Sequence, residues 1–271
     1  MSLLYGRQAL IRVAGLTIEE PRIAFDLRRT PDETADPAQI RIWNLSPEHE
    51  ARIYEGDQPI LLQAGYPATL ATLFDGAVQQ IWREREDLSR ITVLECTGML
   101  QSRRLLGGIT SRSYAGDVPV RRLIRDIIAD LGLAPGPLDL INPAAQYRNF
   151  AWSRTSTSAL SYLAHAIGLR WFESDGLIRF RREGVPQPDA PTIDCNPDRG
   201  MISSPTPTED GLEVRMLLTG EVQIGSKVHL RSEIYHGTFI CTNIRHIGDT
   251  WDGPFETKLE IRPEMAEAPS G

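Results

Sequence analysis

The sequence predicts a mainly β, α+β fold in which two antiparallel β units flank a small α/β module. First, residues 255–261 alternate between apolar or threonine side chains and charged ones, the period-two pattern of a half-buried antiparallel strand. Second, residues 58–98 repeat the plan of residues 211–263: strand, turn, strand, charged hairpin and strand. Third, between these two units, residues 117–131 change to the helical period.

The chain has 271 residues, which is long enough for two or three small domains with buried cores. Its composition, 41% hydrophobic and 24% charged, is that of an ordinary globular protein. No stretch approaches the roughly 20 apolar residues that cross a bilayer, and residues 1–8 lack the features of a secretory signal. We therefore expect a protein that is made and folded in a cytoplasm, without stable membrane insertion.

Cysteine usage and charge exclude several classes. Cys96, Cys195 and Cys241 are odd in number and widely spaced, so they indicate neither a disulfide framework nor a Cys-x-x-Cys zinc site. The net charge of −7 argues against a protein that grips nucleic acid tightly, because such binding needs clustered Lys and Arg. A channel past which DNA slides without sticking stays possible.

Six strands are predicted before residue 100: 9–13, 22–28, 39–43, 60–66, 73–81 and 91–96. Ser46 is placed to cap a short helix that has Pro47 at its first position and runs to about Tyr54. The last two strands flank a charged tip at Arg83–Asp87. Six strands suffice for a small closed or nearly closed sheet, which we expect to end near Leu106.

A helix is predicted over 117–131 with Asp117 as its cap, because apolar residues recur there at the spacing of one buried helical stripe. A second helix, capped by Ser156 or Thr157, and a hairpin over 169–180 complete a compact α/β module.

A proline-containing segment, residues 183–191, predicts a semi-rigid linker after this module. The strands predicted beyond it are 212–218, 227–231, 237–244 and 255–261. The expected organisation is a first β unit at 1–106, the α/β module at 107–184, a second β unit at 185–265 and a flexible tail at 266–271.

The sequence contains no Gly-x-Ser-x-Gly elbow, no phosphate-binding Gly-rich loop with lysine and no His-Glu-x-x-His helix. His229, His236 and His246 are predicted on a charged strand face, in a turn and at the start of a polar hairpin, which does not favour a metal site. We therefore expect no enzyme, with no catalytic residue, no metal ligand and no cofactor.

Two hairpins are candidate protein-contact sites instead. At Arg83–Asp87 arginines alternate with carboxylates, which is typical of a solvated or partner-facing tip. On the hairpin after Ile244, Trp251 follows Gly248–Thr250, where contact with a partner and local packing are equally favoured for a large aromatic. The candidate interface residues are Arg83, Arg85, Asp87, Arg245, Asp249 and Trp251.

Several segments together resemble the baseplate hub proteins of phage tails, including the late control D-type hubs and the hub portion of type VI secretion spikes. They are Ile40–Ser46, Ile60–Tyr66, Leu73–Gly76, Ala159–Gly176, Thr208–Val214 and Arg245–Asp249, and they occur in the order of that family over nearly the whole chain.

The resemblance implies a homotrimer in which each chain supplies two tube-like β-barrels with an α/β module inserted between them. Three chains would form a pseudo-sixfold ring that joins a sixfold tail tube, or a distal tail protein, to a threefold central spike among other baseplate proteins. Its acidic lumen would let DNA or a tape-measure protein pass. Such a ring is expected in the virion tail baseplate after assembly in the host cytoplasm.

Two alternatives stand beside the hub. A tail-associated cell-wall hydrolase or peptidase would need a catalytic triad or metal set that the sequence does not supply. A tail-tube or oligonucleotide-binding barrel module is disfavoured by the acidic charge and by the inserted helical unit.

Overall fold

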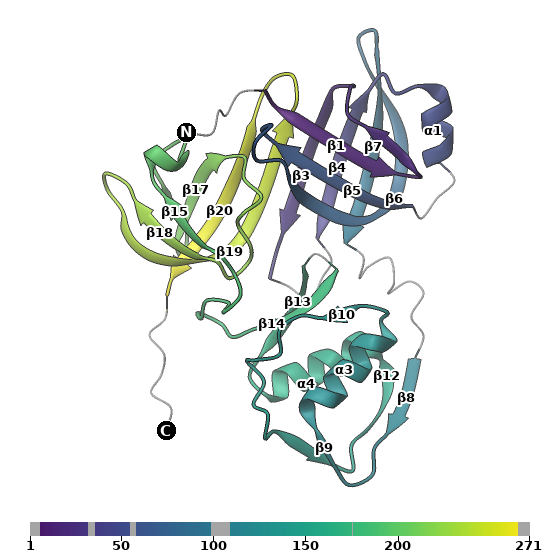
Figure 1. Cartoon of the computed structure of the whole chain (residues 1–271), viewed down its shortest axis with the longest axis vertical. Coiled ribbons are helices and arrows are strands. Elements are labelled where there is room, and N and C mark those ends of the chain that lie inside the picture. The colour runs from purple at the N-terminus through teal and green to yellow at the C-terminus, as the bar shows by residue number, and fades with distance from the viewer. Residues whose placement is uncertain (1–5, 32–35, 55–57, 99–108, 175, 265–271) are drawn as a thin grey trace. The chain divides into compact units, whose positions relative to one another are not determined.

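The computed structural model describes residues 6–31, 36–54, 58–98, 109–174 and 176–264. The chain divides into two compact units (Figure 1). Unit 1 comprises residues 1–30, 36–97 and 184–271, and unit 2 comprises residues 31–35 and 98–183. The chain therefore leaves unit 1 at two places and returns to it after each. Both units are rich in antiparallel strands, as the sequence predicts.

The first half of unit 1 contains the strands β1 Gln8–Val13, β2 Leu16–Ile18, β3 Ile23–Arg29, β4 Pro37–Trp43, β5 Pro59–Gly65, β6 Ala71–Glu86 and β7 Ser89–Gly98, and the helix α1 Pro47–Ile53. The predicted helix start is confirmed, since the Ser46 hydroxyl accepts a hydrogen bond from the backbone N–H of His49 and Pro47 takes the first position. The predicted charged tip is mostly strand, because β6 continues to Glu86 and leaves Asp87 and Leu88 as the turn.

The second half contains β15 Thr192–Cys195, β16 Thr206–Pro207, β17 Leu212–Leu217, β18 Lys227–Arg231, β19 His236–Asp249, β20 Phe255–Pro263 and the short 3-10 helix η1 Pro197–Arg199. The shared face predicted for residues 212–218 is confirmed, since every second residue from Leu212 to Leu218 is buried. Gln187, inside the predicted linker, is also buried and donates its backbone N–H to the carbonyl of Gly225.

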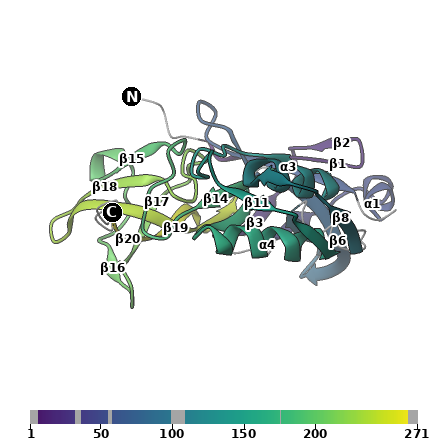
Figure 2. The same cartoon turned by 90° about the horizontal axis from the view of Figure 1, so that it is seen from below.

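All strands of unit 1 belong to one sheet, whose main path has the order β16-β17-β20-β19-β3-β4-β7-β6-β5-β1-β2 (Figure 1). Figure 2 gives the view from below, turned by 90°. Strand β18 pairs with β19, and β15 runs parallel to β18. The pairing path among the described strands is open. The two halves join where Ala24–Arg29 of β3 runs antiparallel to Ile244–Asp249 of β19.

Each half repeats the same strand order. The first half reads β1-β5-β6-β7-β4-β3, and the second reads β15-β18-β19-β20-β17-β16. In both, three consecutive strands form a meander and the strand before the meander returns to pair with its last member. The sequence predicted this echo between residues 58–98 and 211–263.

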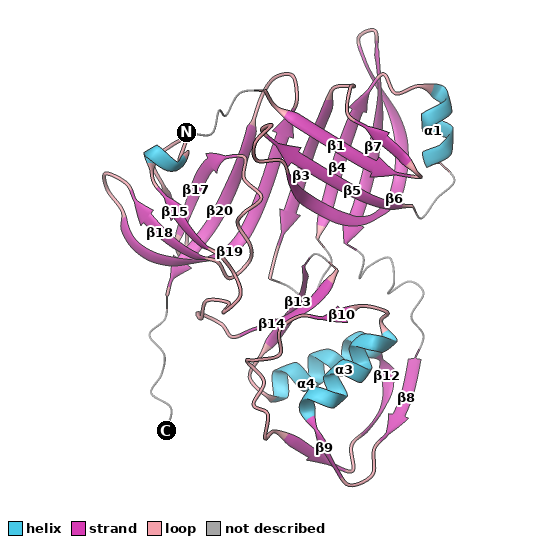
Figure 3. Cartoon of the chain, in the orientation of Figure 1, coloured by secondary structure: helices cyan, strands magenta, loops and turns pink. Residues whose placement is uncertain are grey.

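Unit 2 contains α3 Val120–Asp130 and α4 Ser156–Ala166 with the strands β8 Ile109–Ser113, β9 Asp117–Pro119, β10 Ala134–Pro135, β11 Gln146–Arg148, β12 Ala151–Thr155, β13 Arg170–Ser174 and β14 Leu177–Arg181 (Figure 3). The predicted caps are wrong for both helices. Asp117 lies in β9 opposite Arg148, and Pro119 occupies the cap of α3. The cap of α4 is Thr155, whose hydroxyl accepts from the backbone N–H of Ser158.

The core of unit 2 is its own, since the apolar faces of α3 and α4 pack with Trp152, Trp171 and Phe180. The buried stripe predicted for the first helix is confirmed. The predicted boundary near Leu106 and the predicted tail at 266–271 lie outside the described residues.

Candidate functional site

The six predicted interface residues lie on two hairpins of unit 1. Arg83, Arg85 and Asp87 belong to the β6–β7 hairpin, and Arg245, Asp249 and Trp251 belong to the β19–β20 hairpin. Successive side chains of a strand point to opposite faces, so residues adjacent in sequence have different neighbours.

Arg83 is bound within the molecule. Its Nε donates a 2.6 Å hydrogen bond to Oε1 of Glu50 on α1. The buried Glu50 carboxylate also accepts from the hydroxyl of Thr92, and the Arg83 guanidinium lies 5.4 Å from the ring centre of Tyr54. The hydrogen bond to Glu50 raises the pKa of Arg83. Arg83 therefore fastens α1 to β6.

Two carboxylates of the same hairpin, those of Glu84 and Glu86, are also bound. Glu84 accepts from Arg41 Nη2 at 2.6 Å and from Trp82 Nε1 at 2.9 Å, and Glu86 accepts from Trp43 Nε1 at 3.1 Å. These bonds occupy the carboxylates that alternate with the arginines.

Arg85 and Asp87 are exposed, and neither has a hydrogen bond or ion pair to another described residue. Asp87 takes a left-handed backbone conformation, with φ of 50°, as tight hairpin turns require. The next residue, Leu88, is a fully exposed apolar side chain. The end of this hairpin is thus free to contact another molecule.

Arg245 links the two halves of the sheet. Its Nε and Nη2 donate to the two carboxylate oxygens of Asp26 on β3, the first of these bonds being 2.8 Å long. The hydrogen bond from Arg245 lowers the pKa of Asp26, and the same bond raises the pKa of Arg245.

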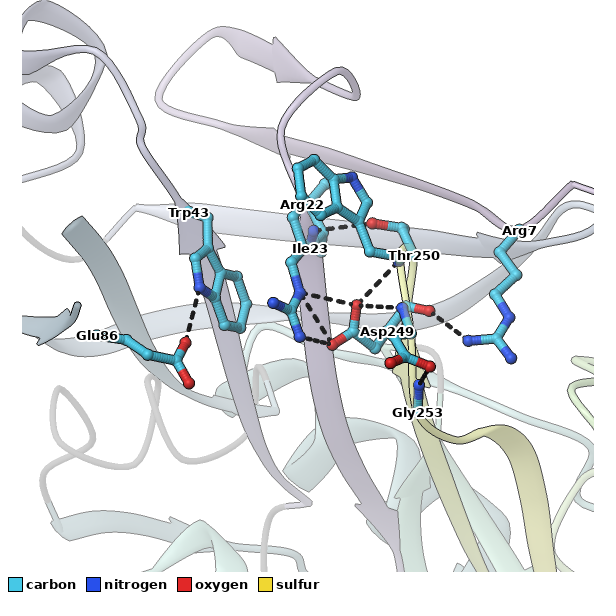
Figure 4. A network of polar contacts seen from close by, with 10 residues as sticks. Arg7, Arg22, Ile23, Trp43, Glu86, Asp249, Thr250 and Gly253 are labelled. Carbon is cyan, nitrogen blue, oxygen red and sulfur yellow. Dashed lines mark hydrogen bonds and ion pairs between the residues drawn. The ribbon is translucent and has the colours of Figure 1, made fainter. Parts of the chain in front are cut away.

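Asp249 lies at the centre of a polar network (Figure 4). Its carboxylate accepts from Arg22 Nη2 at 2.7 Å and from the backbone N–H of Trp251 at 2.9 Å, and its carbonyl accepts from Arg7 Nη1 at 3.0 Å. Burial raises the pKa of Asp249, but the hydrogen bonds from Arg22, Trp251 and Asp252 outweigh burial and hold that pKa below its usual value.

The network continues from Arg22 to the other hairpin. The Arg22 guanidinium lies 4.3 Å from the ring centre of Trp43, and Trp43 in turn donates to Glu86 (Figure 4). Sequence reasoning missed Arg22 and Trp43, because nothing in the local pattern links Arg22 to an aspartate 227 residues away. Only the pairing of β3 with β19 brings them together.

Trp251 is 74% exposed, so local packing does not cover its ring. It lines a groove of about 390 Å³ together with Leu10, Leu70 and the exposed Glu19 and Glu20. The Asp249 carboxylate fixes the backbone from which this side chain projects.

The three histidines of the second half lie apart. His246 does not start a polar hairpin as predicted: it is buried within β19, where Nδ1 lies 3.0 Å from the Thr257 hydroxyl, and burial lowers its pKa to about 3. His229 contacts Thr238, and His236 is exposed. In the part of the chain that the structure describes, no three His, Cys, Asp or Glu side chains are grouped as metal ligands.

The cysteines are all buried, and burial raises the pKa of each thiol, that of Cys195 to about 12. Within the described ranges, no helix has the length and apolar character needed to span a membrane.

The fold has counterparts among solved structures. A tail protein from Neisseria meningitidis MC58 superposes with a TM-score of 0.66 at 14% identity over 96% of this chain and 97% of its own. The 43 kDa tail protein of prophage MuSo2 from Shewanella oneidensis gives 0.70 at 8% identity over 96% and 98%. The E. coli c3393 protein, a component of the type VI secretion system, gives 0.60 at 10% identity over 95% and 77%.

No curated protein sequence matches the chain. Residues 38–260, however, match the family described as baseplate hub gp41. This match covers residues 98–183 of unit 2 and reaches into both halves of unit 1, from β4 to β20. The chain therefore belongs to the baseplate hub gp41 family of phage tail proteins.

Proposed function

We propose that this baseplate component is a structural hub that forms a homotrimeric, pseudo-sixfold ring between the tail tube and the central spike. The observation that carries the proposal is the repeated strand order in the two halves of unit 1. A chain that contains two copies of one unit offers six copies per trimer, so it can match a sixfold tube on one side and a threefold spike on the other.

Hydrogen bonds at equivalent positions support the repeat. The N–H of Trp43 donates to the carbonyl of Arg22 at 3.0 Å, and the N–H of Leu217 donates to that of Gly200 at 2.8 Å. One residue later, Asn44 donates to Arg90 at 2.7 Å and Leu218 donates to Phe255 at 3.2 Å. We infer that residues 1–106 and 185–265 are the two tube-like barrels of the ring and that residues 107–184 are an insertion between them.

The partners in this proposal are two further copies of the chain, the tail tube or a distal tail protein, the spike and neighbouring baseplate proteins. DNA or a tape-measure protein would pass through the lumen, where a negative wall limits attraction of phosphates; the net charge of −7 is consistent with such a wall. The ring would be assembled in the host cytoplasm before it enters the virion.

Of the candidate interface residues, we assign Arg85, Asp87 and Trp251 to contacts with neighbouring proteins, because their side chains are exposed. Arg83, Arg245 and Asp249 would position the hairpins, because they bind Glu50, Asp26 and Arg22 within the chain. The proposed role is structural and involves no catalysis.

The test is the position of the chain in an assembled particle, determined by electron cryomicroscopy of tails without imposed symmetry. We expect three copies around the axis, with both halves of unit 1 at equal radius between tube and spike. A single copy, a position away from the axis, or the absence of the chain from tails would overturn the proposal.

A further inference from the structure

The β3–β19 junction inside one chain is a template for a contact between chains. At this junction the N–H of Thr250 donates to the carbonyl of Ile23 at 3.0 Å, and the ion pairs Arg22–Asp249 and Arg245–Asp26 cross it. On one edge of β19, strand β18 pairs with residues 236–240 and β3 pairs with residues 244–249. The segment paired with β3 is therefore the one next to the β19–β20 turn.

The first half has the same edge without a strand on it. Strand β5 pairs with β6 over Ala71–Ala77, and no other described strand lies along the outer edge of Ile81–Glu86. The second half has the edge that would pair with it. Met201–Pro207 runs beside β17, where the N–H of Ile202 donates to the carbonyl of Arg215 at 2.8 Å. The opposite edge of this segment has no strand partner among the described residues.

We propose that Ile81–Glu86 of one copy pairs antiparallel with Met201–Pro207 of the next copy, in the manner of the junction within the chain. The proposal rests on the ring described above and identifies the strands that close it. A contact between two different surfaces of identical chains propagates from copy to copy and closes when the rotation permits. Three junctions within chains would then alternate with three between chains.

The repeat also predicts the register. Gly200 occupies the position of Arg22, so Ile202 corresponds to Ala24, and Glu86 corresponds to Asp249 as the last strand residue of its hairpin. The observed pair Ala24↔Asp249 therefore translates into Ile202 opposite Glu86.

Proline limits this contact to a short ladder. Since Ile23 bonds outward to β19 while Arg22 bonds inward to β4, Met201 faces outward in the equivalent segment. The register on β17 shifts by two residues between Met201↔Met216 and Thr206↔Glu213, so Ser203–Pro205 is an irregular stretch of this edge. Positions 205 and 207 are prolines, which have no N–H to donate. The N–H of Met201 already donates to the carbonyl of Asn196 at 3.1 Å, so of these positions only Ser203 remains as a donor. The junction between copies is therefore shorter than the one within each chain. The prolines also discourage uncontrolled pairing of this edge.

Exposed groups at both edges fit the pairing. Ile202 is 44% exposed at one edge, and Leu88 is fully exposed beside the other. Arg199, exposed just before Gly200, faces the hairpin end that carries Glu86 and Asp87 in this register, so opposite charges meet as they do between Arg22 and Asp249. The contact would bury the side chains of Ile202 and Leu88, which are exposed to solvent in the single chain.

The test is disulfide cross-linking between two single-cysteine variants, Ile202→Cys and Glu86→Cys, mixed in equal amounts and treated with a mild oxidant. Directly opposed residues of a non-hydrogen-bonded antiparallel pair lie close enough for a disulfide. The three native cysteines are buried and have raised pKa values, so the introduced thiols are the reactive ones. We expect a covalent dimer from the mixture and a covalent trimer from the double variant on non-reducing gels.

The matched control is Ile234→Cys, an equally simple change at a 69% exposed isoleucine on the β18–β19 hairpin, mixed with Glu86→Cys. This pair should cross-link at least tenfold less. If the chains form a ring in tails but Ile202→Cys and Glu86→Cys do not cross-link there, the strand pairing is wrong while the hub survives. If the chain is monomeric and absent from tails, both ideas fail.

Discussion

Asp249 ties together three segments that are distant in sequence. Arg22 lies just before β3, Arg7 lies just before β1, and Trp251 belongs to the hairpin turn. A nearly buried carboxylate with charged and backbone donors has its acceptor capacity filled, which compensates for its desolvation. The residue keeps the hairpin in place and leaves the indole of Trp251 exposed.

Replacement of Asp249 by asparagine is expected to lower the free energy of unfolding by about 1–3 kcal/mol, because it weakens charge-assisted bonds at a poorly hydrated site. Urea denaturation would measure the change. The control is Asp210→Asn, which breaks an exposed 2.9 Å pair with Arg262 and should cost less than about 1 kcal/mol. Equal losses for the two variants would contradict the structural role of Asp249.

His246 predicts a pH dependence of stability. Its folded pKa of about 3 lies below its ordinary value of 6.5, so the unfolded chain takes up this proton first. Its contribution is complete above pH 6.5 and is lost as the pH falls toward 3, at up to about 1.4 kcal/mol per pH unit.

Denaturation between pH 6.5 and 5 reports this term before the carboxylates begin to protonate. In the variant His246→Gln, the slope of the free energy of unfolding against pH should fall over that range by the amount that corresponds to about one bound proton. An unchanged slope in the variant would show that His246 is not buried as a neutral side chain.

At the scale of elements, the junction of β3 with β19 depends on a close approach. A Cβ atom on Gly248 would lie 2.1 Å from the ring of Phe25, so the ring occupies the space that a side chain would take. Phe25 also meets Phe255 edge-on at 6.2 Å between ring centres. The Phe25 ring therefore fills the space beside Gly248 at the place where the two halves of the sheet join.

Gly248→Ala is therefore expected to destabilise unit 1 by about 1–3 kcal/mol, because Phe25 must leave a packed position. Combining it with Phe25→Leu should cost less than the sum of the two single changes, since the smaller side chain makes room. Denaturation of the four proteins gives the coupling energy. Simple additivity would mean that the glycine is not required by the contact with Phe25.

At the scale of the whole molecule, the two units differ in how they depend on the rest of the chain. Unit 2 has a core drawn from its own helices and strands. In unit 1, Leu218 and Phe255 of the second half join the core cluster of the first half. The halves of unit 1 therefore share apolar burial, although each repeats the same strand order.

The fragment 98–183 is expected to fold alone, with cooperative thermal unfolding and dispersed amide resonances, because its core is self-contained. The fragment 184–264 is the contrasting control, and it should stay largely unfolded because Phe255 and Leu218 lose their partners. A folded 184–264 fragment would show that the halves of unit 1 are independent.

Local patterns anticipated the elements of this protein because period, caps and turns act over a few residues. The alternation in residues 255–261, the Ser46–Pro47 helix start and the buried stripe of α3 were all readable from neighbouring residues. The cap of α3 was not, because Asp117 is held in β9 by Arg148 and its neighbours through strand pairing. A pattern states which conformations are favourable, and long-range pairing selects among them.

The candidate hairpins were located from their charge and aromatic content, but the roles of Arg245 and Asp249 depended on contacts across more than 200 residues. Arg245 binds Asp26 and Asp249 binds Arg22, whereas Arg85 and Trp251 remain exposed. The two ion pairs follow from the pairing of β3 with β19, whose cost in chain entropy is offset by contacts that no short segment contains. The repeated strand order was legible in the sequence, and only the folded sheet showed the junction between its two copies.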